Sequence, residues 1–272
     1  MATLYDFIIS LLWIGLILSL ASGLRRLVRS YYDASSPNEV PFIQVLIEEA
    51  IAAAELCGCC FELIIVADNY GITAYAVLLF LLTIWWSNCW GNATACPYNH
   101  LEDVLTGDTD MKTALLKGIA QLIGGISVFR LTQYLWGLEL AKTHVGRSDE
   151  DCTADLQVPM FIGALIEGTA TCLCRICSRA LGDLQPSFST AMDAFIGTSL
   201  VVAAFNYSGG YFNPVLATSL KFGCKGNTAM EHLVVYWIGA CSGALLSVMV
   251  YKHPSVQRAI LGEENISSKK MD

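Results

Sequence analysis

The feature that most constrains this chain is a pair of motifs that occurs twice. Leu46-Ile47-Glu48 is followed, after a long apolar stretch, by Cys96-Pro97-Tyr98, and Leu165-Ile166-Glu167 is followed at a similar distance by Asn213-Pro214-Val215. Both glutamates lie in long apolar segments, whereas both prolines open segments too short to cross a bilayer. Interrupted segments at matching positions in two halves of a membrane protein indicate a pore or binding site near the middle of the membrane. The repeat therefore predicts a channel or transporter for small solutes.

The overall composition is typical of an integral membrane protein. Hydrophobic residues make up 54% of the 272 residues and charged residues only 15%, and the mean hydropathy is +0.52. A soluble domain of this size carries more charge and shorter apolar runs. The net charge of −8 comes without any basic stripe, so nucleic acid is not an expected partner. No P-loop, dinucleotide-binding glycine pattern or metalloprotease signature occurs, so we expect neither an enzyme nor a bound cofactor.

The eleven cysteines do not have the spacing of a metal site. One cluster lies at 57–60 and another at 172–177, both inside apolar segments. Buried cysteine packs as a small hydrophobic residue, and no histidine stands at zinc-ligand spacing from either cluster. We therefore expect no metal site. Cys152 and Cys224 are the two cysteines expected to face a compartment outside the membrane, and the sequence leaves open whether they form a disulfide.

Seven apolar runs reach the roughly 20 residues that a helix needs to cross the hydrocarbon core of a bilayer. They lie at about 4–24, 41–66, 71–90, 111–138, 157–181, 187–206 and 230–251. The stretches 97–105 and 214–222 are shorter, and a helix of that length covers about 13 Å, roughly half of the core. Proline is favoured in the first turn of a helix, and Asn213 is a suitable N-cap. We therefore predict two half-helices that enter the membrane from opposite faces.

The distribution of Lys and Arg predicts the orientation of the chain. Basic residues follow the first apolar run, close the fifth and fill the tail after 251, all on one face if the chain crosses seven times from outside. The acidic residues 149–151 then lie on the opposite face, and the C-terminus is cytosolic. No basic residue precedes the first run, which argues against a cleaved signal peptide, although the small residues Ser19 and Ala21 leave cleavage open.

Several segments together resemble the aquaporin, or major intrinsic protein, family. The run 206–214 resembles its second pore loop, 120–125 its third core helix, and 236–243 its sixth. The resemblance covers about 41–251. It implies an all-α polytopic membrane fold in which six helices and two re-entrant half-helices form an inverted repeat, with an extra apolar helix at 1–30 and a cytosolic tail at 252–272. It also implies a homotetramer in the lipid bilayer, with one pore in each subunit.

The pore motifs depart from the common aquaporin pattern. Family members carry Asn-Pro-Ala twice, whereas this chain has Cys96-Pro97-Tyr98 and Asn213-Pro214-Val215. Leu216 stands where water channels have a selectivity-filter arginine, and Val201 falls where they have a filter histidine. Together with the extra N-terminal segment and Cys224, these departures resemble the unorthodox, aquaporin-11-like branch, whose members are mostly intracellular.

The resemblance implies a passive channel. Asn213 would donate hydrogen bonds to the permeating molecule, whereas the thiol of Cys96 is a weak donor. A filter made of Val201 and Leu216 is apolar and wide, which implies modest water flux and passage of glycerol or hydrogen peroxide. If Tyr98 or Leu216 closes the pore instead, the protein is a non-conducting scaffold with the same fold.

Two glutamates in apolar segments allow a third interpretation. Glu48 and Glu167 are ionisable groups at membrane depth, as in proton-coupled transporters. The resemblance implies instead that both accept hydrogen bonds from the backbone of the pore loops. Glu49 lies beside Glu48, and the repeat favours Glu48 as the inward-facing residue. Asp193, in the sixth apolar run, has no partner that the sequence suggests.

The end of the chain suggests where the protein resides. The last four residues, Lys269-Lys270-Met271-Asp272, resemble a dilysine signal that returns membrane proteins to the endoplasmic reticulum. Such a signal acts on the cytosolic side, in agreement with the orientation given above. An ordinary solvated basic tail is the alternative.

Overall fold

The chain is helical over the part that the computed structural model describes, residues 2–35 and 40–268, with side chains described up to residue 262. Within these ranges the chain has no β-strand, and one isolated bridge joins Thr153 to Lys225. The elements are α1 (Leu4–Ser35), α2 (Phe42–Cys89), α3 (Pro97–Thr106), α4 (Met111–Gly137), η1 (Lys142–His144), α5 (Met160–Leu184), α6 (Ser189–Ser208), α7 (Pro214–Lys221), α8 (Ala229–His232), η2 (Leu233–Gly239), α9 (Ala240–Lys252) and α10 (Pro254–Ser268).

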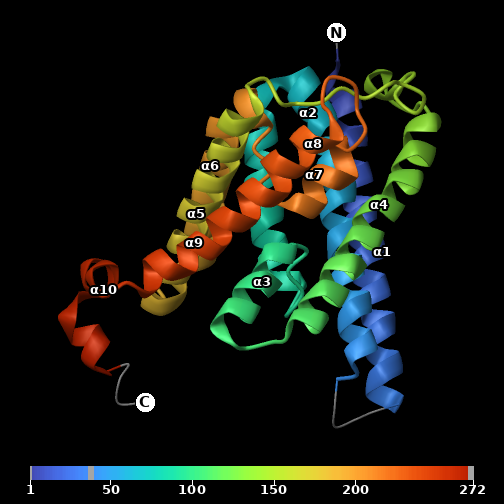
Figure 1. Cartoon of the computed structure of the whole chain (residues 1–272). Coiled ribbons are helices and arrows are strands. Elements are labelled where there is room, and N and C mark those ends of the chain that lie inside the picture. Colours follow the sequence, from blue (N-terminus) through green and yellow to red (C-terminus); the bar gives the residue numbers. More distant parts are fainter. Residues whose placement is uncertain (1, 36–39, 269–272) are drawn as a thin grey trace.

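The described helices account for all seven predicted apolar runs. Five are long and apolar enough to cross a membrane: α1, α2, α4, α5 and the continuous helix formed by α8, η2 and α9. The α2 helix accounts for two runs, because its backbone leaves helical geometry at Gly71 (φ 83°, ψ 168°), where the chain turns back (Figure 1). Glycine adopts a positive φ at little steric cost. The α6 helix, with 20 residues, supplies the remaining run.

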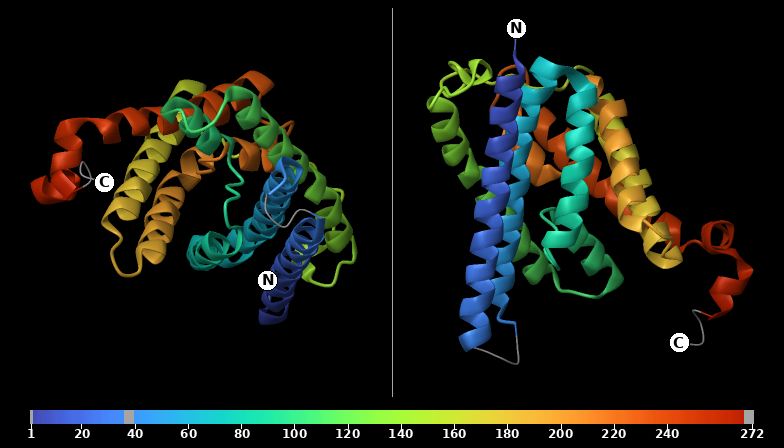
Figure 2. Two further views of the ribbon diagram at one scale, coloured as in Figure 1. Left: turned by 90° about the horizontal axis from the view of Figure 1, so that it is seen from below. Right: turned by 180° about the vertical axis from the view of Figure 1, so that it is seen from behind.

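Two groups of long helices flank the short helices α3 and α7. In Figure 1, α1, the first arm of α2 and α4 lie on one side, whereas α5 and α6 lie on the other. The view from below in Figure 2 shows the same separation. The α3 helix lies toward the end of the bundle that carries α10, and α7 lies toward the end at which the chain begins. The segments predicted at 97–105 and 214–222 are therefore short helices in opposite halves of the bundle.

A buried ion pair joins the extra helix α1 to α2. Nη1 of Arg25 lies 2.5 Å from Oε2 of Glu55, and the two side chains are 3% and 0% exposed. The indole N–H groups of Trp85 and Trp90 also donate to Glu55, at 3.3 and 3.0 Å. A buried carboxylate needs such partners, because an unpaired charge is costly away from water. The α1 helix is therefore packed into the bundle by polar as well as apolar contacts.

A second buried carboxylate of α2 holds the loop that follows α4. Oε2 of Glu62 accepts a hydrogen bond from the indole of Trp136 at 2.9 Å, and Oε1 lies 2.8 Å from Nε2 of His144. Trp136 is near the end of α4 and His144 is in η1. Both side chains are buried, so this cluster fixes the start of the long connection to α5.

Glycines allow the closest helix crossings in each half of the bundle. A Cβ atom on Gly124 of α4 would lie 1.9 Å from the carbonyl oxygen of Ala50 on α2, and one on Gly243 of α9 would lie 2.0 Å from that of Gly168 on α5. No larger residue fits either position without moving a backbone. Small residues at such crossings are typical of helix packing in membranes.

A disulfide ties the connection between α4 and α5 to the loop after α7. Cys152 and Cys224 are bonded, which answers the question that the sequence left open. Next to the disulfide, Lys225 N–H donates to the carbonyl of Cys152 at 3.0 Å, and Ala154 N–H donates to that of Lys225 at 2.9 Å. The disulfide and these two hydrogen bonds together join the two loops.

Candidate pore

The chain repeats one backbone conformation at the start of α3 and of α7. Cys96 (φ −145°, ψ 123°) and Asn213 (φ −151°, ψ 113°) are the extended N-cap residues, and each precedes the proline that opens its helix. The residues before them, Ala95 and Phe212, both have positive φ, 51° and 46°. Non-glycine residues in this region are strained and persist only where the surroundings hold them. The two junctions therefore have the same geometry, and both must be held in place.

Buried carboxylates hold both junctions in the same way. Oε1 of Glu167 accepts the N–H of Tyr211 at 3.2 Å, and Oε2 accepts that of Phe212 at 2.7 Å. In the other half, Oε2 of Glu49 accepts the N–H of Thr94 at 3.1 Å and that of Ala95 at 3.2 Å. Both glutamate side chains are fully buried. Each carboxylate thus binds the two backbone N–H groups that precede an N-cap residue.

The structure corrects the choice of Glu48 as the support of the first loop. Glu48 points away from the loop and pairs with Arg29 of α1, whose Nη2 lies 2.6 Å from Oε2. Its other oxygen accepts a hydrogen bond from Gln44 at 2.9 Å. One residue further along a helix turns the side chain by about 100°, so only Glu49 faces the loop. The contacts that the resemblance implies for Glu167 are present, whereas those assigned to Glu48 are made by its neighbour.

The Glu49 carboxylate belongs to a larger polar cluster. Nε2 of Gln121 on α4 donates to its Oε2 at 2.8 Å, and Nε2 of His100 on α3 lies 3.0 Å from its Oε1. The Gln121 amide also reaches the hydroxyl of Thr94, at 3.2 Å. The cluster therefore connects α2, α4 and the start of α3. No sequence motif singled out His100.

Asn213 links the two junctions directly. Its Nδ2 donates to the carbonyl of Ala95 at 2.9 Å, so the two N-cap regions are in contact. Its Oδ1 accepts the N–H groups of Val215 at 3.0 Å and of Leu216 at 3.3 Å, which caps α7. Cys96 makes no such side-chain cap on α3. The first half thus lacks a capping side chain, while both helices direct their N-terminal, partly positive ends toward the junction.

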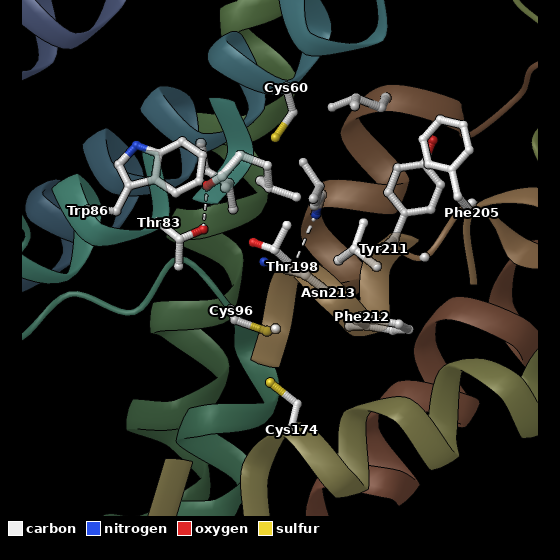
Figure 3. Close-up of a pocket in the computed structure, with 18 of the residues that line it drawn as sticks. Cys60, Thr83, Trp86, Cys96, Cys174, Thr198, Phe205, Tyr211, Phe212 and Asn213 are labelled. Atoms are coloured by element: carbon white, nitrogen blue, oxygen red, sulfur yellow. Dashed lines mark hydrogen bonds between the residues drawn. The ribbon is translucent and has the colours of Figure 1, made fainter. Parts of the chain in front are cut away.

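A cavity of about 700 Å³ passes these junctions. Asn213 and Cys96 line it, as do both predicted filter residues, Val201 and Leu216. Figure 3 shows the lining side chains on both sides of Asn213, with Phe205 and Tyr211 on one side and Cys174 on the other. The cavity thus extends to both sides of the point where the two halves meet.

Comparison with known proteins gives the family. No family model matches the chain. Aquaporin-11 of Milnesium tardigradum is 28% identical over 251 residues, which cover 92% of this chain and 89% of that protein. Human aquaporin-11 is 25% identical over 88% of both chains, and mouse aquaporin-12 is 29% identical over 75% of this chain and 73% of its own length. These similarities, which cover most of the chain, support the aquaporin-11/12 branch of the aquaporin family. It is accordingly a multi-pass membrane protein.

The bulky tyrosine of the first motif, Cys96-Pro97-Tyr98, is accommodated by small residues. Tyr98 is 9% exposed and packs with Cys96 against Ala240 and Ala244 of α9. The two alanines have no side chain beyond Cβ, which leaves room for the ring. Tyr98 also lines the cavity. The ring is therefore held mainly by the helix bundle, with one face toward the cavity.

The remaining motif residues form the first turns of α3 and α7. Pro214 is the first residue of α7 and is buried. Val215 is fully buried in the main apolar cluster, and its backbone N–H is capped by Asn213. Pro97 takes the equivalent first position of α3 and is also buried. These three residues build the junction and do not line the cavity in the described part of the chain.

The cavity wall also contains polar residues that the sequence did not indicate. Asp193, for which no partner was expected, accepts a hydrogen bond from the hydroxyl of Ser178 at 2.6 Å, and both line the cavity. Arg175 lines it as well. An arginine inside an apolar run is a recognised sign of a functional position. In the sequence analysis, Arg175 was only one of the basic residues that predict the orientation of the chain in the membrane.

The last two predictions concern a metal site and the C-terminal lysines. Among the described residues, no group of three or more His, Cys, Asp and Glu side chains could hold a metal ion. Lys269 and Lys270, the proposed retrieval signal, lie outside the described residues.

Proposed function

We propose that this aquaporin is a passive channel for water and small neutral solutes, including glycerol and hydrogen peroxide, in an intracellular membrane. The observation that carries the proposal is the cavity that extends to both sides of the paired N-cap residues. A scaffold would need only the helix packing, and it would have no need of a continuous space at this place. No enzymatic activity is proposed.

In the proposed mechanism, α3 and α7 are re-entrant half-helices that enter from opposite faces. Their N-terminal dipole ends meet near the middle of the membrane and create a positive potential that disfavours cations. The amide of Asn213 presents one N–H to the carbonyl of Ala95, and its second N–H is available to a permeating oxygen. Water oriented by such donors cannot maintain a proton wire.

The proposed filter is formed by Val201 and Leu216. Both line the cavity and are partly buried. Neither side chain donates a hydrogen bond, so single-file water loses partners there, whereas a larger neutral solute is not excluded by charge. This is the basis for proposing glycerol and peroxide beside water.

Two alternatives make different demands on the site. A non-conducting scaffold requires Tyr98 or Leu216 to close the cavity, and both do line it. A proton-coupled transporter requires a carboxylate that can exchange protons with the pore. Glu167 is surrounded by Ser208 and two backbone N–H donors, and Glu49 by a similar set. These contacts favour a structural role for both carboxylates and hence passive transport.

The setting of the channel is also part of the proposal. We propose a homotetramer in the endoplasmic reticulum, held there by Lys269 and Lys270 on a cytosolic C-terminus. The disulfide supports this orientation, because the two loops that it joins lie at the end of the bundle where the chain begins, whereas α10 lies at the other end (Figure 1).

Stopped-flow light scattering of proteoliposomes tests the function. Purified protein should accelerate shrinkage in an impermeant osmolyte, and reswelling in glycerol, relative to protein-free liposomes of the same lipid. Peroxide entry is followed with an entrapped dye. A pH gradient should leave the glycerol distribution at equilibrium unchanged. Rates equal to those of empty liposomes for all three solutes would favour the scaffold, and glycerol accumulation driven by the pH gradient would favour the transporter.

A further inference from the structure

Arg175 brings a positive charge to the cavity at a place remote from the usual filter position. Four charged side chains line the cavity among the described residues: Asp68, Asp155, Arg175 and Asp193. Arg175 is the cation of this set. Its neighbour Cys174 lies on the side of Asn213 opposite Phe205 and Tyr211 (Figure 3). The charge is therefore separated from the mouth that carries Asp155 and Tyr211.

The guanidinium of Arg175 is held rigidly by α3. Its Nε lies 3.0 and 3.2 Å from the two carboxylate oxygens of Glu102, and its Nη2 lies 2.6 Å from Oε2. The Glu102 side chain is only 4% exposed, whereas that of Arg175 is 24% exposed. A two-point contact of this kind fixes the plane of the guanidinium. The contact thus fixes the position of the guanidinium in a residue that lines the cavity.

The charge of Arg175 is not cancelled by its partner. Glu102 also binds Arg179, whose Nη2 lies 2.8 Å from the same oxygen. Two guanidinium groups therefore share one carboxylate, so Glu102 alone does not neutralise both. Arg179 does not line the cavity, so Arg175 is the member of the pair that a permeating molecule meets.

The acidic residues of the cavity differ in how they are neutralised. Asp68 is paired with Arg147 at 2.7 Å, and Asp155 with Lys221 at 2.9 Å. Asp193, on α6, is bonded to the neutral hydroxyl of Ser178. It is therefore the acidic group that would attract a cation into this half of the cavity if no positive charge stood nearby.

We propose that Arg175 is the charge-selectivity residue of this channel, excluding cations from the half of the pore that contains Asp193. The proposal rests on the function proposed above. The other pore positions offer little charge or hydrogen-bond donation. Leu216 and Val201 have neither a charge nor a side-chain donor, and the thiol of Cys96 is a weak donor. A fixed charge in a narrow cavity of low dielectric acts strongly on ions and weakly on neutral solutes.

The test compares Arg175→Met with Arg179→Met in proteoliposomes. Both variants remove one guanidinium from Glu102 and leave the other in place, but only the first changes the cavity wall. Rubidium uptake under a negative internal potential should rise at least about tenfold in Arg175→Met and stay at the wild-type level in Arg179→Met. Water shrinkage is measured on the same preparations and should be retained in both.

Two further variants separate charge from fold. Arg175→Lys keeps the positive charge and should keep rubidium out, and Asp193→Asn added to Arg175→Met should reduce the leak. Equal rubidium uptake in the Met variants at 175 and 179, or a leak in Arg175→Lys as large as in Arg175→Met, would overturn the proposal. Absence of water flux in the wild type would contradict the proposed function and, with it, the role of Arg175. Equal rubidium uptake together with normal water flux would overturn the role of Arg175 alone.

Discussion

Glu48 and Glu49 are neighbours in the sequence and have different tasks in the fold. Glu49 is fully buried and binds the backbone of the first junction, whereas the side chain of Glu48 is 14% exposed and pairs with Arg29, which is 41% exposed. The repeat aligned Glu48 with Glu167 because both follow Leu-Ile. Which of two adjacent helix residues faces inward depends on the rotation of the whole helix, and that rotation is set by its contacts with α1 and α4.

This difference predicts unequal effects of two matching substitutions. Glu49→Gln replaces an acceptor oxygen by a donor amide among four donor groups, and each buried donor left without a partner costs about 1–3 kcal/mol. Glu48→Gln weakens a half-exposed ion pair, which contributes about 0–1 kcal/mol. Thermal unfolding in detergent, followed by tryptophan fluorescence, should therefore show a clear loss for Glu49→Gln and a small one for Glu48→Gln. The reverse order would mean that Glu49 does not support the junction.

The filter residue Leu216 predicts how the channel discriminates between water and glycerol. Leu216→Arg adds bulk and hydrogen-bond donors to a wall that now has only methyl groups. Glycerol permeability should fall more than water permeability, because the larger solute meets the narrower gap first. Leu216→Met, which nearly conserves volume, is the control and should leave the ratio of the two rates near that of the wild type. An equal loss of both fluxes, or a gain for glycerol, would show that residue 216 does not line the constriction.

Among the elements, α1 is the one whose role the sequence left most open. Its apolar run predicted a helix, and the lack of a preceding basic residue argued against a cleaved signal. The sequence could not show what α1 packs against, because Arg25 and Glu55 are far apart in the chain. The buried pair between them, with the indoles of Trp85 and Trp90, appears only when the two helices are side by side.

Arg25 should therefore matter far more than the arginine beside it. Arg25→Met leaves Glu55 with a buried, uncompensated charge, which costs about 3–5 kcal/mol when one partner of a buried pair is removed. Arg26 is exposed, so Arg26→Met should be nearly neutral. The yield of monodisperse protein in mild detergent, measured by size-exclusion chromatography, should drop for Arg25→Met only. Partial recovery is expected when Glu55→Gln is added, and similar profiles for the two arginine variants would contradict the role given to α1.

At the scale of the whole molecule, the sequence predicts the class of fold better than the wall of the cavity. The lengths of apolar segments can be read directly from the sequence. They distinguish the runs that can cross a bilayer from the two proline-led segments that are too short to do so. Gly71 reverses α2 where the sequence placed a boundary between two runs. The cavity wall depends instead on which faces of α5 and α6 turn inward, so Arg175 and Ser178 were not singled out as cavity residues.

In the proposed function, the cavity between the two halves is the permeation path. Thr198 of α6 is buried and lines this cavity (Figure 3), whereas the next residue, Ser199, is exposed. The most direct measurement is the osmotic shrinkage rate of proteoliposomes that contain equal amounts of wild-type protein, Thr198→Trp or Ser199→Trp. We expect the indole at 198 to fill the path and reduce the rate to that of protein-free liposomes. The indole at 199 should point away from the cavity and leave the wild-type rate. Equal rates for the two variants would contradict this expectation.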